Sequence, residues 1–378
     1  MTIPAIADAA EGGMVWPQFL ISATASLFVG MSLVLGSRSR QFAIGVKEAF
    51  VLTTLSWIVI AAFASLPILL SMPEIGISGA FFEAMSGLTT TGSTVIANLD
   101  ETARGILLWR ALLQWLGGIG IIVMAIAVLP LLGVGGMQLF RIEMSDHSKK
   151  LLPRAGPTAA WITMTYGALT LIWAAALWTA GMSPFEAICH AMTTIATGGF
   201  STADGSIGAF NSSVIDWIIV TGMLVGSLPF LLYVQAVRGD PLALLRDSQV
   251  RYFLALCLIS AVLMTAWIFF RLDAPVSTAL RYAAFSTTSI VTGTGFTTTP
   301  FDNWGTFPVT LLFFLMFVGG CTGSTTGGIK IFRFQVLFNS IRAELSHFVR
   351  PHMVSAPRFN GEPVPDPIIR AVRVFFFV

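Results

Sequence analysis

The chain has 378 residues, of which 55% are hydrophobic and 11% charged, and its mean hydropathy is +0.81. Soluble domains carry about 25% charged residues, so the composition excludes a soluble domain and predicts an all-α polytopic membrane protein surrounded by lipid. The net charge of +2 gives no indication of a nucleic-acid partner, and none is expected.

Apolar runs long enough to cross a bilayer as helices, about 20 residues each, recur along the chain. We expect membrane helices at about 14–36, 48–71, 106–132, 157–180, 213–237, 252–271 and 307–318. A further run begins near Ile368 and stops at Val378. Because that run is too short for a membrane helix, we expect the natural protein to continue beyond it.

The basic residues divide unevenly between the two sides that these helices define. Of the 21 basic residues, only Arg104, Arg110, Arg271 and Arg281 fall on one side. By the positive-inside rule the richer side is cytoplasmic. The first helix then runs inward from the outer side, an unusual start that suggests a helix preceding it in the natural protein.

The cysteines Cys189, Cys257 and Cys321 have no metal-ligand spacing, and the four histidines form no cluster. Buried small apolar side chains explain the cysteines better than a disulfide or a metal site. We therefore expect no bound cofactor, and no sequence pattern of an enzyme is present.

One pattern occurs three times along the chain. Its copies align without gaps as FEAMSGLTTTGSTV (82–95), CHAMTTIATGGFST (189–202) and FSTTSIVTGTGFTT (285–298). Each copy lies on the outer side and contains a short helix followed by a Thr/Gly turn. Ser183 with Pro184, and Pro275, mark the beginning of two of these helices. At about 12 residues they are too short to span, which predicts re-entrant half-helices.

The turns suit a cation. The alignment superposes Gly92, Gly199 and Gly295, and glycine adopts the positive φ angles that turn successive carbonyls to one side. Such carbonyls replace the water shell of a desolvated ion, and the preceding half-helices direct their negative C-terminal ends to the same point. Close helix packing is the alternative for any single cluster of small residues, but it does not explain three in register.

Several charged residues admit two interpretations. Glu83 and Glu186, in the first halves of two half-helices, either stabilise helix N-termini or form an outer ring that concentrates cations. Acidic residues of the outer loops either attract cations or are simply solvated. Lys330 and Arg333 are either ordinary cytoplasmic flanks or a positive barrier at the inner mouth of a pore. Segment 140–157 is either a docking surface for a regulator or a solvated loop.

These motifs resemble the Trk/Ktr/HKT superfamily of cation transporters, most closely its TrkH type. The resemblance extends over nearly the whole chain and is carried by FFEAMSGLTTTGST, ATGGFST, GTGFTTTPFDNW, GGCTGSTTGGIKIFR and the long segment 112–144. It implies four helix, pore-loop, helix repeats around a pseudo-fourfold pore, of which the fourth is missing from this chain. It also implies potassium as the transported ion, a homodimer in the inner membrane with the filter facing outward, and a cytosolic nucleotide-binding regulator of the RCK class.

The resemblance implies the following filter residues, acting through backbone oxygens: Thr90, Thr91, Gly92, Thr197, Gly198, Gly199, Gly293, Thr294 and Gly295. In some sodium-selective plant members serine occupies the position of Gly92, so glycine here favours potassium. The family's fourth filter loop, and an arginine in its last helix, lie beyond Val378. The expected organisation is a first helix (1–45), repeat one (46–140), repeat two (141–240), repeat three (241–350) and the start of repeat four after a linker (351–378).

The stretch GGCTGSTTGGIK (319–330) interrupts the second helix of repeat three. A phosphate-binding loop requires lysine directly after glycine and a preceding strand, whereas here Ile329 intervenes and a membrane helix precedes. The resemblance implies an intramembrane loop that obstructs the pore. Its expected gate residues are Gly319, Gly320, Gly323, Ser324, Thr325, Thr326, Gly327, Gly328 and Lys330.

The sequence therefore predicts potassium uptake through a gated, carbonyl-lined filter. Two alternatives remain open: a proton- or sodium-coupled secondary transporter, and a non-conducting subunit if the natural chain ends at Val378.

Overall fold

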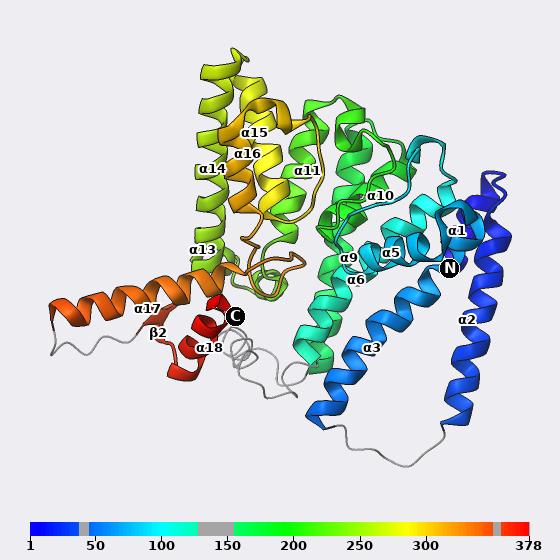
Figure 1. The fold of residues 1–378 in the computed structure, drawn as a ribbon, viewed down its shortest axis with the longest axis horizontal. Coiled ribbons are helices and arrows are strands. Elements are labelled where there is room, and N and C mark those ends of the chain that lie inside the picture. Colours follow the sequence, from blue (N-terminus) through cyan, green and yellow to red (C-terminus); the bar gives the residue numbers. More distant parts are fainter. Residues whose placement is uncertain (38–44, 128–154, 351–356, 378) are drawn as a thin grey trace. The chain divides into compact units, whose positions relative to one another are not determined.

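The computed structural model describes residues 1–37, 45–127, 155–350 and 357–377, and these form two compact units (Figure 1). The first unit comprises residues 1–120, 170–222 and 294–298; the second comprises 121–169, 223–293 and 299–378. The predicted repeat boundaries do not coincide with these units and remain a prediction.

The first unit contains the N-terminal helices and two of the half-helices. Its elements are α1 (Thr2–Ala10), α2 (Trp16–Gly36), α3 (Val46–Ala64), α4 (Leu66–Ser71), η1 (Pro73–Ile75), α5 (Gly76–Leu88), η2 (Leu99–Glu101), most of α6 (Arg104–Ala127), α10 (Pro184–Ile195) and η3 (Ser206–Phe210). Three helices have residues in both units: α6, α9 (Ala155–Thr179) and α11 (Ser213–Gly226).

The second unit contains the third half-helix and the C-terminal elements. They are α12 (Phe230–Val237), α13 (Ala243–Arg246), α14 (Ser248–Leu272), α15 (Val276–Val291), η4 (Phe301–Trp304), α16 (Thr306–Leu315), α17 (Ile331–Val349), β1 (Arg358–Phe359), β2 (Glu362–Pro363) and α18 (Asp366–Phe377). The two strands pair antiparallel around a turn at Asn360 and Gly361.

Among the described residues, five helical segments are long and apolar enough to cross a membrane: 16–36, 50–71, 104–122, 158–179 and 248–272. These agree with five of the predicted runs and confirm the helical, multi-pass class. The predicted continuous helix at 213–237 is wrong, because α11 and α12 meet at an angle of 93°. Gly226 and Pro229 flank this break, and proline cannot continue a helical hydrogen-bond ladder.

The three half-helices form as predicted. α5, α10 and α15 have 13, 12 and 16 residues, and at 1.5 Å per residue none reaches the roughly 30 Å of a bilayer core. At α10 the expected start signal is confirmed, since the Ser183 side chain accepts from Glu186 N and the Glu186 carboxylate accepts from Ser183 N.

Small residues bring the half-helix α5 close to the span α6 in the first unit. A Cβ added at Gly117 of α6 would lie 1.8 Å from the carbonyl oxygen of Leu88, at the end of α5. Ala80 and Ala84 of α5 are fully buried in the same core as Ile106 of α6. Close backbone approach through small residues is typical of membrane helix pairs, and it sets the end of α5 against a long apolar helix.

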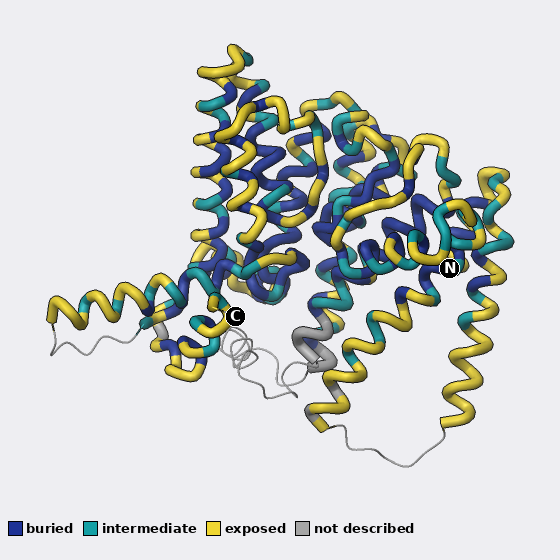
Figure 2. The backbone as a smooth tube through the Cα atoms, viewed as in Figure 1, coloured by how far each residue is buried: buried dark blue, intermediate teal, exposed yellow. Residues whose placement is uncertain are grey.

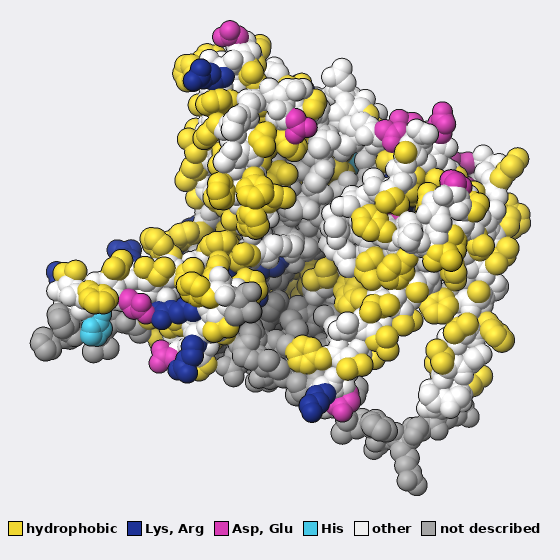
Figure 3. All heavy atoms as spheres, in the orientation of Figure 1, with side chains coloured by type: hydrophobic (Ala, Val, Ile, Leu, Met, Phe, Trp, Pro, Cys, Tyr) yellow, Lys and Arg dark blue, Asp and Glu magenta, His cyan; other side chains and the backbone are white. Residues whose placement is uncertain are grey.

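Burial in the second unit separates a packed face from a face left for lipid. Figure 2 shows buried and exposed positions alternating along α14. Leu258, Ile259 and Phe270 are exposed, and hydrophobic side chains cover the flank of this helix in Figure 3. An exposed apolar flank on a helix of membrane-spanning length fits contact with acyl chains.

Candidate ion pathway: filter turns and intramembrane loop

The first two half-helices end in the same hydrogen-bonded cap. After α5, Thr90 N donates to Gly87 O at 3.1 Å and Thr91 N donates to Ser86 O at 2.9 Å. After α10, Thr197 N and Gly198 N make the corresponding bonds at 3.0 and 2.8 Å. This pair of bonds is the Schellman motif, which requires a left-handed residue directly after the helix end. After α15, the first of these two bonds is also present, because Gly293 N donates to Ile290 O at 3.0 Å.

The three turns that follow the half-helices, here called the filter turns, are turn one (90–92), turn two (197–199) and turn three (293–295), and positive φ angles occur at the same two positions in each. The first position has φ of +55° at Thr90, +50° at Thr197 and +67° at Gly293. Two residues later, the aligned glycines have φ values of +82°, +81° and +84°. The positive φ of the three aligned glycines agrees with the prediction from the sequence. The left-handed backbone at Thr90 and Thr197 was not predicted. The role of these carbonyls as ion ligands remains a prediction.

Within the first unit the turns contact one another through bare backbone. A Cβ at Gly92 would lie 2.1 Å from Gly198 O, and a Cβ at Gly199 would lie 1.8 Å from Thr294 O. Real Cβ atoms do not approach an oxygen so closely, so neither position accepts a side chain without movement. Turn one therefore touches turn two, and turn two touches turn three.

One predicted ligand oxygen already has a protein partner. Gln114 of α6 donates from Nε2 to Gly198 O at 2.6 Å, and its Oε1 accepts from Phe200 N at 3.0 Å. The fully buried Gln114 amide thus holds both sides of turn two. A carbonyl oxygen has two lone pairs, so Gly198 retains one.

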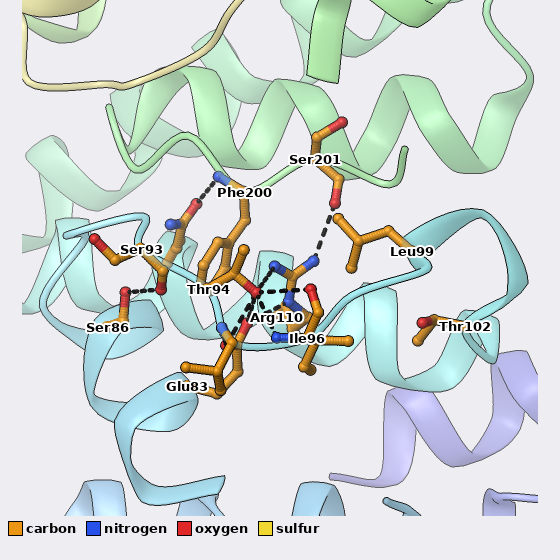
Figure 4. A network of polar contacts seen from close by, with 12 residues as sticks. Glu83, Ser86, Ser93, Thr94, Ile96, Leu99, Thr102, Arg110, Phe200 and Ser201 are labelled. Atoms are coloured by element: carbon orange, nitrogen blue, oxygen red, sulfur yellow. Dashed lines mark hydrogen bonds and ion pairs between the residues drawn. The ribbon is translucent and has the colours of Figure 1, made fainter. Parts of the chain in front are cut away.

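A buried ion pair supports the turns from behind (Figure 4). Glu83 of α5 and Arg110 of α6 lie 2.7 Å apart, with side chains 0% and 1% exposed. Thr94, just after turn one, donates to Glu83 Oε1 at 2.9 Å and accepts from Arg110 Nη2 at 3.1 Å. Arg110 Nη1 also donates to Ser201 O, just after turn two, at 3.0 Å.

This network neutralises charges that would otherwise be costly to bury. Glu83 also accepts from Val95 N at 2.9 Å, and the Arg110 guanidinium lies 4.1 Å from the centre of the Phe200 ring. A buried ion pair needs such additional hydrogen bonds to offset its desolvation. Both interpretations of Glu83 from the sequence are wrong, because it lies in the second half of α5 and is closed off from solvent. Arg110 is likewise no outer-loop residue.

Some acidic residues of the predicted outer loops are buried or hydrogen-bonded to the protein, and others are exposed to solvent. The Asp204 carboxylate accepts from Leu99 N at 3.0 Å and thereby joins the loops that follow turns one and two. Asp216 is buried, whereas Asp100 and Asp273 are exposed. Solvation therefore explains only some of these residues.

The stretch 319–330 docks against the break between α11 and α12. Cys321 N donates to Ser227 O at 3.0 Å, and Phe230 N donates to Gly323 O at 3.0 Å. Thr325 donates to Gly226 O from its hydroxyl at 3.0 Å. Two non-helical segments between helices, about 100 residues apart in the sequence, thus satisfy one another's exposed backbone groups.

Further bonds close the stretch on itself. Gly319 N donates to Ile329 O at 2.9 Å, and Gly320 N donates to the Thr326 hydroxyl at 3.1 Å. Lys330, at the start of α17, donates from Nζ to the carbonyl oxygen of Thr326 and, at 3.1 Å, to its hydroxyl. We call residues 319–330 the inner loop. Its side chains from Cys321 to Thr326 are buried wherever the residue is not glycine.

The comparisons with known proteins agree with this geometry. The family model described as TrkH, cation transport protein, matches residues 16–378. The chain belongs to the TrkH family of cation transport proteins. It is 45% identical over 331 residues to the Trk system potassium uptake protein TrkI of Halomonas elongata, covering 87% of this chain and 67% of that protein.

Two further relatives point the same way. The Trk system potassium uptake protein TrkH of Salmonella typhimurium is 40% identical over 357 residues, which cover 93% of this chain and 74% of the relative. The crystal structure of the potassium transporter TrkH from Vibrio parahaemolyticus superposes with a TM-score of 0.89 at 35% identity, over 100% of this chain and 79% of that one.

Two other charged residues singled out in the sequence make defined contacts in the structure. Glu186 caps α10, as its first interpretation held. Arg333 lies with its guanidinium 3.8 Å from the centre of the Phe375 ring, so it packs on α18. Most of segment 140–157 lies outside the described residues, and its role as a docking surface stays a prediction. Three features were not predicted from the sequence: the contacts of Gln114, the contacts of Arg110, and the break at 226–230. Their hydrogen-bond partners lie far away in the sequence.

Proposed function

We propose that this chain is the pore-forming subunit of a potassium uptake system. The observation that supports this best is the repeated backbone of the three turns, left-handed at the first and third positions, with neighbouring turns in direct contact. Such turns present oxygen atoms at fixed spacing, and carbonyl oxygens are the ligands that replace potassium's water shell. The relatives named potassium uptake proteins favour the same ion.

The charge distribution around the turns favours a monovalent cation that passes through without lasting binding. Each turn follows the negative C-terminal end of a half-helix. Glu83 is neutralised by Arg110, so it adds no full negative charge that would hold an ion tightly. Partial charges from carbonyls and helix ends attract a cation while permitting its release, which conduction requires.

The inner loop is the proposed gate. It is a non-helical segment between the apolar helix α16 and the amphipathic helix α17, and individual hydrogen bonds join it to the break between α11 and α12. Each such bond contributes about 1 kcal/mol, so the loop can be released without unfolding the helices around it. Lys330 is bonded to the loop itself and would add positive charge to a closed pathway.

The proposed setting is the cell inner membrane, with the turns facing outward and the inner loop toward the cytoplasm. We propose that the subunit works with other Trk components, as a homodimer that binds an RCK-type cytosolic regulator. The relatives are transporters, and no catalytic activity is proposed.

Rubidium uptake into liposomes that contain the full-length protein tests this function. Downhill uptake, with rubidium and potassium competing and sodium excluded, is the expected result. Uptake that strictly requires a proton or sodium gradient would establish the coupled-transporter alternative instead. Absence of any uptake from a folded protein, with or without cytosolic components, would leave the non-conducting subunit as the correct reading.

Deletion of residues 322–326 tests the gate separately. The shortened protein should conduct faster than the natural one if the loop obstructs the path. Unchanged or reduced uptake in a folded variant would make the inner loop a structural element.

A further inference from the structure

A cavity of about 360 Å³ lies in the second unit, between the start of α14, the middle of α17 and the β1–β2 turn. Side chains that donate hydrogen bonds dominate its lining: Arg246, Arg251, Tyr252, Gln335, Asn339 and Arg358. Neither the filter turns nor the inner loop contributes to it.

The walls of this cavity are fixed by hydrogen bonds. Asn360, in the β1–β2 turn, accepts from Ser248 N at 3.0 Å and donates to the Asp247 carboxylate at 3.0 Å. Asn339 of α17 donates to Arg358 O at 2.9 Å. The turn is thereby held to both helices, and Arg358 is carried to the rim of a preformed cavity.

A buried donor in the lining lacks a partner. Gln335 of α17 is only 6% exposed, and its Nε2 makes no hydrogen bond among the described residues. Its Oε1 lies 3.5 Å from the Ser248 hydroxyl, so the amide's other end is occupied. An unpaired buried N–H costs about 1–3 kcal/mol, which an acceptor bound in the cavity would remove.

Two of the three arginines at the cavity are not paired with an acidic residue among the described residues. Arg246 makes one exposed pair with Asp240 at 3.5 Å. Arg251 and Arg358 have no ion-pair partner in the part of the chain that the structure describes. The Asp247 carboxylate is already used, since it accepts from Val250 N and from Asn360.

We propose that this cavity binds a phosphate group, carried either by a lipid headgroup or by a free phosphate compound. Phosphate oxygens accept several hydrogen bonds and match the planar fork of arginine. The three arginines supply the charge, and Gln335 Nε2 supplies the buried contact. We call the cavity the phosphate pocket.

Its place in the fold makes a lipid headgroup a realistic source. Arg251 and Tyr252 lie near the start of α14, the helix of membrane-spanning length whose flank carries exposed apolar residues. Basic and aromatic side chains at the end of a span lie at headgroup depth. The same donors would accept free phosphate, so the two sources must be separated by experiment.

Two binding measurements on the purified protein separate them. In the first, protein from vesicles of phosphatidylcholine with added phosphatidylglycerol is examined by native mass spectrometry for retained phosphatidylglycerol. In the second, delipidated protein is dialysed against radiolabelled inorganic phosphate. Retained phosphatidylglycerol identifies the headgroup, and saturable phosphate uptake identifies a free compound. Either result supports the phosphate pocket if the variants below respond as expected.

Arg251→Gln and Arg358→Gln should each weaken binding about tenfold, because a hydrogen bond to a charged group contributes on that order. Gln335→Glu should abolish binding, since it places a carboxylate of the same size against the arginines. Arg342→Gln is the matched control: this exposed arginine also lies on α17 but outside the cavity, and its loss should change nothing.

The proposal is overturned if neither measurement detects binding to the natural protein. It is equally overturned if Arg342→Gln weakens binding as much as Arg251→Gln, because the attraction would then be general surface charge. Should Gln335→Glu fail to fold, the two exposed arginine variants still decide. Transport is not measured, so the result is independent of the proposed potassium uptake.

Discussion

The filter turns and the inner loop are both irregular backbone between helices, but their polar groups make different kinds of contact. In the turns, the hydrogen bonds that cap the half-helices fix the backbone. A glycine of one turn packs directly against a carbonyl oxygen of the next. In the inner loop, backbone and hydroxyl groups are bonded to the loop itself, to the 226–230 break and, through Thr322 N, to Gln249 of α14. A membrane requires every exposed backbone group to find a partner or a water-lined path.

The difference lies in what holds each region. The turns are supported by a fully buried charged network that leaves little freedom to move. The inner loop is joined to the 226–230 break by neutral hydrogen bonds, each contributing about 1 kcal/mol. The proposed filter requires a rigid region, and the proposed gate requires a releasable one. The following variants test this contrast, from the largest expected effect to the smallest.

The largest effect is expected at the buried pair. Arg110→Met leaves Glu83 charged and without its main partner in an apolar core. Removing one member of a buried ion pair costs about 3–5 kcal/mol, so the variant should unfold at much lower temperature or fail to accumulate. Thermal unfolding of the detergent-purified protein measures the loss.

An exposed pair in the same unit serves as the control. Arg104 and Glu11 are also in contact, but their side chains are 53% and 42% exposed. Arg104→Met should therefore cost less than about 1 kcal/mol. The double variant Glu83→Gln with Arg110→Met should recover part of the loss. Equal effects of Arg104→Met and Arg110→Met would show that the buried network does not support the turns.

The next largest effect is expected at the crowded glycines of the turns. Gly199→Ala would place a Cβ 1.8 Å from Thr294 O, so one turn has to move. Gly92→Ser adds a larger group at the corresponding contact with Gly198 O. Both variants should lose discrimination between potassium and sodium, measured as relative rubidium and sodium uptake.

Gly181→Ala is the control for the left-handed backbone alone. Gly181 has φ of +110°, but no atom lies within 4 Å of its added Cβ. It should lose only about 1–2 kcal/mol of stability from backbone strain and keep its selectivity. Unchanged selectivity in Gly92→Ser and Gly199→Ala would remove these turns from the filter.

The same contrast explains what the sequence could predict. The left-handed glycines and the half-helix starts depend on local chain geometry, so the aligned motifs and Ser183 with Pro184 were sufficient to find them. The partners of Glu83 and Gln114 depend on which helices pack together. Arg110 lies 27 residues beyond Glu83, and Gly198 lies 84 beyond Gln114, so no periodic pattern connects them.

The inner loop shows the same limit. Its glycines and threonines predicted an interruption of helical structure. Because it follows an apolar run, the sequence analysis assigned that interruption to a membrane helix. The sequence at 226–230 also contains residues that interrupt helices, Gly226 and Pro229, but apolar residues surround them on both sides. Composition alone therefore favoured a continuous helix, and only the hydrogen bonds between the two interruptions reveal that they form one structure.

A moderate effect is expected at the threonines of the inner loop. Thr325→Val removes the hydroxyl that donates to Gly226 O at 3.0 Å while keeping shape. Losing about 1 kcal/mol from the closed arrangement should raise the open population, and with it rubidium uptake, roughly fivefold.

Thr322→Val is the matched control in the same loop. The Thr322 hydroxyl is buried and makes no hydrogen bond among the described residues, so replacing it should leave uptake unchanged or make closure slightly firmer. If both valine variants raise uptake equally, packing rather than the bond to Gly226 holds the loop closed.

The smallest effect is expected at the first position of the turns, where two threonines and one glycine share a left-handed backbone. Thr197 pays the steric cost of that conformation, about 1–2 kcal/mol, yet glycine there would lose more entropy on folding, about 0.5–1 kcal/mol. Gly293→Thr and Thr197→Gly should therefore shift unfolding by less than about 1 kcal/mol, in opposite directions. Gly293 has room for a Cβ, since no described atom lies within 4 Å. A large loss in Gly293→Thr would mean that turn three differs from the others at the one position where its residue type does, and that three equal turns are not the basis of the site.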